Sequence, residues 1–303
     1  CIQYAASARW SIAVRRISEG MAAYIPISAV FFLLLVTVGW PYLYDTSADS
    51  IRQIVGKEGV KLGADKALFL SQPVVIIKGL LFYAFWFWLA NKIRKNSIAQ
   101  KDSPDPKGLF RKNVKLSIGF LIPFAYLFSI HCIDLLMALE PKFFSTMFGV
   151  YCFSGLLLST FCVIALIALL MRQVNPTVRE MIGHRQLYDL GSWTMAFSCF
   201  MMYIGFSQYM LIWYANIPEE TVYMIERTEG GWEYVLAILP LLKWIIPFFV
   251  LMPQGFRGHP LILILVAFFV LAGQWIDMYW MIYPVFFETP AQAIPGLAEL
   301  GAF

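Results

Sequence analysis

Five ionisable side chains stand inside long apolar stretches of the sequence and are the first candidates for chemistry. They are Lys78, His131, Asp134, Lys243 and Asp277. If these stretches cross a bilayer, each charge costs several kcal/mol at mid-membrane, so such groups normally face the bundle interior and mark paths for ions, protons or ligands. The sequence leaves two interpretations open: a proton path, or buried ion pairs that only fix the register of the helices.

The spacing of these groups suggests specific partners. His131 and Asp134 are three residues apart, so they share one helix face and are expected to touch as a proton relay. Gln274 and Asp277 share a face in the same way, and Gln208 stands at a similar depth in another apolar stretch. A histidine that only bonds a backbone carbonyl is the structural alternative for His131.

Lys243 has prolines on both sides, at Pro240 and Pro247. Each proline removes a hydrogen bond and frees a carbonyl one turn earlier, which predicts a kinked, polar and locally wet helix. Pro123 is expected to act likewise in the stretch that holds His131. Such a helix suits ion passage.

Two acidic residues, Glu219 and Glu220, follow Pro218 just after an apolar stretch that ends in Trp213 and Tyr214. A proline followed by acids is typical of the first turn of a helix. The alternative interpretation is an acidic mouth that receives protons or a docking edge on the outer side.

Metal chemistry is not expected. The five cysteines occur singly, without the close spacing of zinc or iron-sulfur ligands, and only one of the three histidines lies in an apolar stretch. We therefore expect no metal, haem or other cofactor on this chain, and we expect the cysteines to be small packing residues.

The composition defines the elements that must hold these residues. The chain is 60 % hydrophobic and only 14 % charged, whereas a soluble domain is roughly 45 to 50 % apolar and about 25 % charged. An all-α integral membrane protein is expected, a polytopic bundle in the lipid bilayer with no nucleic-acid partner. Seven spans are predicted, approximately at residues 22–40, 70–90, 114–137, 148–171, 193–214, 235–251 and 261–286.

Loop charges predict the orientation. Alternate segments, beginning with the one that holds Cys1, contain 14 Lys and Arg, and the intervening segments contain 6. Cytoplasmic loops are the basic ones, so residue 1 is expected on the cytoplasmic side and residue 303 on the periplasmic side. The chain begins with Cys1 and shows no signal peptide, so residues 1–303 are expected to be one transmembrane domain of a longer chain, truncated at both ends.

One long run is similar to a known family. Residues 205–221, GFSQYMLIWYANIPEET, resemble the second of the two large polysulfide-reductase-type (NrfD-like) membrane subunits of alternative complex III, a bacterial quinol:electron-acceptor oxidoreductase. Trp10 with Arg15-Arg16, the Glu19-Gly20-Met21 segment and residues 286–299 extend the resemblance over most of the chain.

The resemblance implies ten spans, in two four-helix bundles plus extra helices, in the bacterial cytoplasmic membrane. It implies a sister NrfD-like subunit, an iron-sulfur subunit and haem c subunits as partners, with quinol or menaquinol used at the level of the complex. It also implies that His131, Asp134, Lys243 and Asp277 serve a proton path. Lys78 is a further candidate for this path because of its place inside an apolar stretch. Gln208 and Gln274 become candidates for a quinone-facing surface.

Two other classes of function are open. The first is a structural scaffold subunit without its own activity. The second is a secondary transporter, which would be expected to show internal repeats with matching broken helices. Prolines interrupt two of the predicted spans, but no repeated motif is evident, so the sequence does not favour this class.

Overall fold

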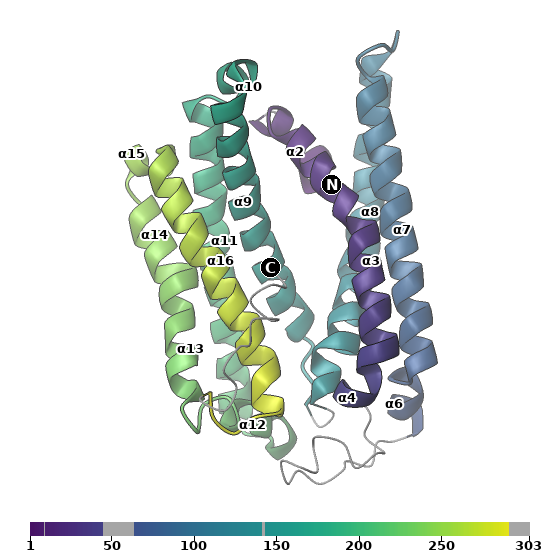
Figure 1. The fold of residues 1–303 in the computed structure, drawn as a ribbon, viewed down its shortest axis with the longest axis vertical. Coiled ribbons are helices and arrows are strands. Elements are labelled where there is room, and N and C mark those ends of the chain that lie inside the picture. The colour runs from purple at the N-terminus through teal and green to yellow at the C-terminus, as the bar shows by residue number, and fades with distance from the viewer. Residues whose placement is uncertain (9, 45–63, 141–142, 291–303) are drawn as a thin grey trace.

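The computed structural model describes residues 1–8, 10–44, 64–140 and 143–290, and this part of the chain is helical without a strand. Seven of the described helical segments are long and apolar enough to cross a membrane. The predicted class, an all-α multi-pass membrane protein, is therefore confirmed (Figure 1).

The first group of helices comes from the N-terminal half. Short helices lead into the first span, which contains a π-helical segment, and a long antiparallel hairpin follows. The elements are α1 (Ile2–Ala5), η1 (Trp10–Ile12), α2 (Arg15–Met21), η2 (Ala22–Tyr24), α3 (Ile25–Leu34), the π segment η3 (Leu35–Gly39), α4 (Trp40–Leu43), α6 (Ala64–Phe69), α7 (Gln72–Ala99), α8 (Pro106–Leu135) and η4 (Met137–Leu139).

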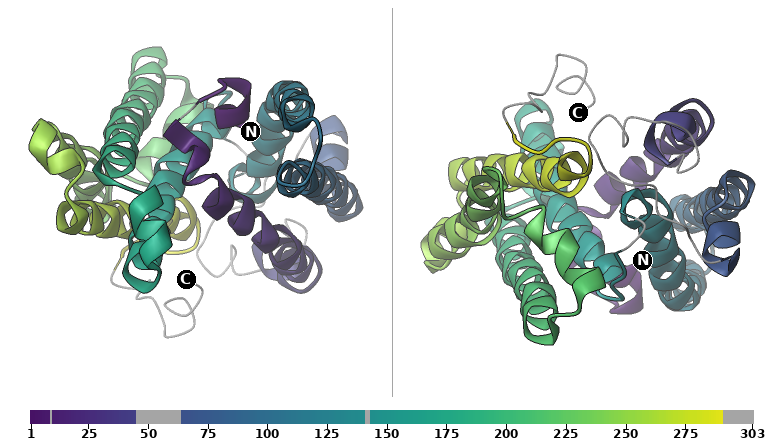
Figure 2. Two further views of the ribbon diagram at one scale, coloured as in Figure 1. Left: turned by 90° about the horizontal axis from the view of Figure 1, so that it is seen from above. Right: turned by 90° about the horizontal axis from the view of Figure 1, so that it is seen from below.

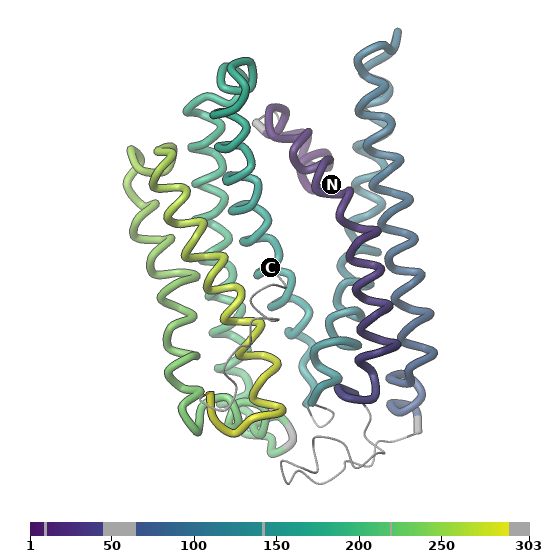
Figure 3. The backbone as a smooth tube through the Cα atoms, in the orientation of Figure 1, coloured from purple at the N-terminus to yellow at the C-terminus, as the bar shows by residue number. Residues whose placement is uncertain are grey.

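The second group contains four spans, and one of them is broken by a π segment. Figure 3 shows that this span nevertheless runs as one continuous rod. The elements are α9 (Phe148–Val174), α10 (Pro176–Met181), α11 (His184–Ala215), α12 (Pro218–Ile225), α13 (Trp232–Pro240), the π segment η5 (Leu241–Ile245), α14 (Ile246–Leu251), α15 (Gln254–Arg257), α16 (Pro260–Ile282) and η6 (Tyr283–Val285).

The observed helices contain all seven predicted spans almost completely and extend beyond several of them. The additions are largest at the ends predicted to be cytoplasmic, where α7 continues to Ala99, α8 begins at Pro106 and α11 begins at His184. Hydropathy marks only the part of a helix that lies in lipid, whereas backbone hydrogen bonds and caps decide where the helix ends. At α8, for example, the Asp105 side chain accepts a hydrogen bond from the backbone N–H of Gly108 at 2.9 Å.

The two groups form separate bundles that meet along α8 and α9 (Figure 2). α9 is the central helix of the second bundle, because half of its most apolar window is buried, against 11 % in the spans Arg15–Leu43 and Pro106–Leu139. Small residues such as Gly155, Ala165 and Ala168 let neighbouring helices approach α9 closely.

Close packing makes one glycine a sharp test of this arrangement. A Cβ added at Gly191 in α11 would lie 2.3 Å from the backbone oxygen of Arg257. We expect Gly191→Ala to destabilise the protein by about 1–3 kcal/mol, because backbone must move to admit the methyl group. Gly119→Ala in α8, where nothing lies within 4 Å, should be neutral or slightly stabilising. Unfolding in mixed micelles measures both, and equal effects would contradict the packing described.

Candidate functional site

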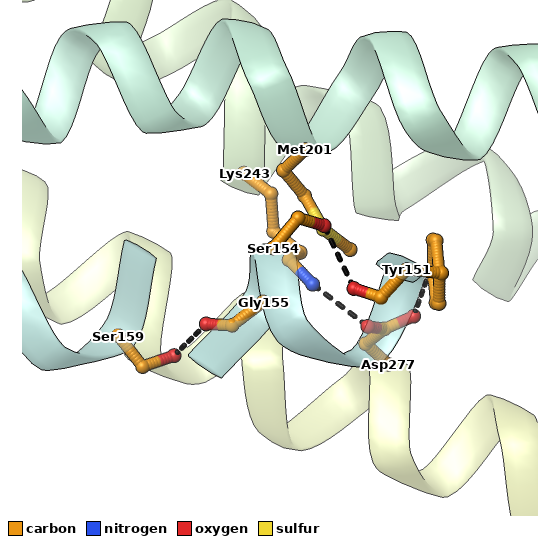
Figure 4. A network of polar contacts seen from close by, with 7 residues as sticks. All are labelled: Tyr151, Ser154, Gly155, Ser159, Met201, Lys243 and Asp277. Carbon is orange, nitrogen blue, oxygen red and sulfur yellow. Dashed lines mark hydrogen bonds and ion pairs between the residues drawn. The ribbon is translucent and has the colours of Figure 1, made fainter. Parts of the chain in front are cut away.

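The second bundle encloses a buried network of three polar side chains from three helices (Figure 4). The Lys243 Nζ atom lies 2.7 Å from Oδ2 of Asp277, and the Tyr151 hydroxyl donates to Oδ1 of the same carboxylate at 2.5 Å. Lys243 is 3 % exposed and Asp277 1 % exposed. Each oxygen of the buried carboxylate therefore has a hydrogen-bond donor, one from a cation and one from a neutral phenol. These two contacts compensate the charge in the absence of water.

Local backbone geometry explains how Lys243 reaches this position. The π segment η5 begins directly after Pro240 and ends two residues before Pro247, as expected where prolines interrupt the hydrogen-bond ladder. Gly273 in α16 faces the lysine, and a Cβ there would lie 2.8 Å from Lys243 Cγ. The absence of a side chain at residue 273 therefore makes room for the lysine stem beside α16.

A cavity of about 230 Å³ adjoins the network. It lies between α9, α11, α12, α13, η5 and α16, and its lining is mainly aromatic and methionine side chains. Its polar lining includes Lys243, Tyr151, Tyr223 and the buried Gln208. Burial raises the pKa of Tyr223 to about 12, so this phenol is neutral at physiological pH. The cavity is therefore an apolar space with a few hydrogen-bond donors.

The first bundle contains a second ion pair of the same type. Lys78 Nζ in α7 lies 2.5 Å from Oδ1 of Asp134 in α8, donates to the carbonyl of Phe69 at 3.0 Å, and lies 3.4 Å from the centroid of the Phe69 ring. The lysine side chain is 21 % exposed, so this ion pair is less shielded from solvent than the pair in the second bundle.

The expected contact between His131 and Asp134 does not form. The His131 ring stacks on Phe82, with centroids 4.6 Å apart, and the Tyr83 hydroxyl lies 3.5 Å from its Nε2 atom. Asp134 turns to Lys78 instead, because an ammonium group compensates a buried carboxylate better than a neutral ring does. Helical spacing places two residues on one face but does not choose between partners on neighbouring helices.

The other predicted site residues are dispersed. Gln274 faces Gly155 on α9, where an added Cβ would lie 2.8 Å from its Oε1 atom, and this oxygen has no hydrogen-bond partner among the described residues. Pro218 is the first residue of α12, which confirms the predicted helix start. Glu220 is half-buried in this helix, and the Glu219 side chain lies outside the described residues. His131 belongs to the first bundle, away from the Gln208 cavity.

The two ion pairs occupy corresponding places, and the sequence around them is repeated. Asp134 and Asp277 each lie near the end of the last span of a bundle, and each lysine lies on the preceding span. Each aspartate follows an isoleucine and is followed by proline seven residues later, by two phenylalanines at nine and ten, and by threonine at twelve. The expectation of no repeated motif is therefore wrong. The repeat is hard to recognise in the sequence because the shared residues are few and scattered.

Sequence reasoning also missed two buried polar side chains of the second bundle, Tyr151 and Arg227. In the sequence, nothing distinguishes Tyr151 from other aromatic residues. Its hydroxyl reaches Asp277 only because α9 packs against α16. Arg227 was counted with the outer loops, yet it is 1 % exposed and donates to the carbonyls of Tyr223 and Met281 at 3.0 and 2.9 Å. The signal that identifies Arg227 is a charged side chain in a buried position, and this is visible only in three dimensions.

Among the described residues, no group of three or more His, Cys, Asp or Glu side chains could hold a metal ion. The fold and the site define the chain as a multi-pass helical membrane protein with two lysine–aspartate ion pairs between its helices. A comparison with models of known protein families finds no match, and a search of curated proteins finds no similar sequence.

Proposed function

We propose that the chain is a membrane subunit of a respiratory quinol:electron-acceptor oxidoreductase of the alternative complex III type, and that its second bundle carries protons by way of Asp277. The observation that carries the proposal is the sealed Lys243–Asp277–Tyr151 network beside a cavity. The resemblance of residues 205–221 supports the choice of complex.

The network suits proton exchange for a simple reason. A carboxylate held between an ammonium group and a phenol gains or loses a proton while both neighbours keep hydrogen bonds to it. Three further buried hydroxyls lie in the same bundle, at Ser154 in α9 and at Ser198 and Thr194 in α11, and each donates to a carbonyl of its own helix. They supply the small polar side chains that a proton path needs in an otherwise apolar interior.

The setting follows from the same proposal. The subunit lies in the cytoplasmic membrane of a bacterium, with residue 1 on the cytoplasmic side, because the basic loops share that side. An iron-sulfur subunit and haem c subunits carry the electrons, and a sister NrfD-like subunit of the same fold lies in the membrane with this chain. The cavity with Gln208 is the quinone-facing surface, because its aromatic lining and few donors suit a lipid-soluble ring with carbonyl groups.

The test is the ratio of ejected protons to transferred electrons in the assembled complex. Asp277→Asn removes the group that would exchange a proton with little change in shape, and we expect it to lower this ratio while quinol oxidation continues through the partner subunits. Because the change also leaves Lys243 without its counter-charge, less complex should assemble, and the ratio is measured on the complex that does. Asp134→Asn in the same assay tests whether the first bundle also carries protons. The exposed carboxylate Asp102 supplies the matched control Asp102→Asn, which should change nothing. Full assembly with an unchanged ratio in Asp277→Asn would refute the proton path and leave the scaffold role.

The repeated Ile-Asp motif supports a second candidate, a secondary transporter, because such proteins are built from internal repeats around a site near mid-membrane. This function predicts solute or ion flux through the isolated chain in liposomes without any electron donor. Flux that is lost in both Asp134→Asn and Asp277→Asn would favour the transporter. Flux that is absent from the isolated chain would reject it.

A further inference from the structure

The hairpin between α7 and α8 carries a dense group of cations that no other part of the chain matches. Eight Lys and Arg stand against two Asp over residues 92–115, and all eight cations are exposed. None of them takes part in an ion pair among the described residues. The hairpin cations are Lys92, Arg94, Lys95, Lys101, Lys107, Arg111, Lys112 and Lys115.

The length of α8 places this group relative to a membrane. From Lys115 to Leu135 the helix rises about 30 Å at 1.5 Å per residue, which is the thickness of the hydrocarbon layer. Lys92 and Lys115 therefore lie at the level of the headgroups, and the remaining six cations lie at that level or beyond it. Figure 1 shows that α7 and α8 extend past the ends of α10 and α15 on the same side.

Hydrogen bonds join the two helices of the hairpin, and its charges repel one another. Asn96 donates to Asn113 at 2.9 Å, and the buried Asn113 donates to the carbonyl of Ile93 at 3.1 Å, which ties the two helices together. Lys107, Arg111 and Lys115 follow at intervals of four, so like charges stack on one face of α8 without a counter-charge among the described residues. An anion bound from outside would relieve this repulsion.

The apolar surface below the cations indicates what kind of anion this is. Lys92 Nζ lies 4.9 Å from the ring centroid of Trp88, and Trp88 is 53 % exposed. Ile118 is similarly exposed, one turn below Lys115. Cations above exposed aromatic and aliphatic side chains match a phospholipid, with its phosphate at the cations and its acyl chains along the helix. An acidic soluble protein would account for the cations but not for the apolar rim.

We infer that the α7–α8 hairpin is a binding surface for the headgroups of anionic phospholipids in the leaflet that it enters. The surface is independent of the proton path, because it lies in the other bundle and at the membrane boundary. It would anchor the hairpin and orient the first bundle in the bilayer.

The test uses the purified complex in detergent and compares two fluorescent lipids with the same acyl chains, phosphatidylglycerol and phosphatidylcholine. The hairpin variant Lys95→Gln/Arg111→Gln/Lys112→Gln removes three exposed charges. The matched control Arg172→Gln/Arg179→Gln/Arg185→Gln removes three charges at the end of α9, in α10 and at the start of α11, on the same side of the membrane. Thermal unfolding of both variants should match that of the native protein.

The native protein should bind phosphatidylglycerol more tightly than phosphatidylcholine, and the hairpin variant should lose at least about tenfold in phosphatidylglycerol affinity. The control should lose less than about twofold, and high salt should abolish the difference. Equal losses of phosphatidylglycerol affinity in both variants would show that binding depends only on the overall positive charge, and this would overturn the proposal. Unchanged lipid affinity with loss of a co-purifying acidic protein would overturn it in favour of a protein partner.

Discussion

Lys243→Met is expected to destabilise the second bundle by about 3–5 kcal/mol, because it leaves the Asp277 carboxylate buried without its cation. Methionine has a similar length and is apolar, so the loss reports the missing charge and not a cavity. Tyr151 still donates to the carboxylate, but one neutral hydrogen bond does not compensate a buried charge. Unfolding of the purified chain in mixed micelles, followed by circular dichroism, gives the free energy.

The control removes the whole network. In Lys243→Met/Asp277→Leu/Tyr151→Phe no charge and no phenol remains unpaired, and replacing a complete buried pair by apolar residues is often neutral or stabilising. Stability near the native value is therefore expected for this variant. A fully stable Lys243→Met protein would show that Asp277 is neutral in the folded state, and a triple variant no better than the single one would show that packing, not charge, causes the loss.

Arg227→Met is expected to cost about 3 kcal/mol, the second largest loss. The guanidinium bridges the carbonyls of Tyr223 and Met281 and lies 3.6 Å from the centroid of the Tyr223 ring. Hydrogen bonds from a charged group contribute about 1.5–3 kcal/mol each, and the freed carbonyls would stay buried. Because Arg227 joins α12 to the end of α16, the outer end of the cavity should also loosen. Hydrogen exchange of residues 218–225 measures this opening.

Arg227→Lys is the informative comparison. An ammonium group keeps the charge but lacks the planar fork that reaches two carbonyls at once. Its stability should fall between those of the native protein and Arg227→Met, with faster exchange in α12 than in the native protein. If lysine restores full stability, the charge alone matters and the bridge between the two helices is not the cause.

The helices and their class were readable from the sequence because membrane spans need only length and hydropathy. Every predicted span matches an observed helix, and the start of α12 at Pro218 follows from local chemistry alone. The same local rules mispaired Asp134 with His131. Lys78 is distant in sequence and becomes a neighbour only when α7 packs against α8.

The sequence by itself therefore determined the class of protein, the number of spans and the burial of Asp134, Lys243 and Asp277, because the cost of a charge in lipid depends on residue type and depth. Tertiary structure decided the partners: Lys78 with Asp134, and Lys243 with Asp277 and Tyr151. It also decided that Arg227 is buried and that the hairpin cations are exposed. The physical reason is that helical periodicity specifies the face on which a side chain lies, whereas the helix that meets this face depends on the packing of the whole bundle.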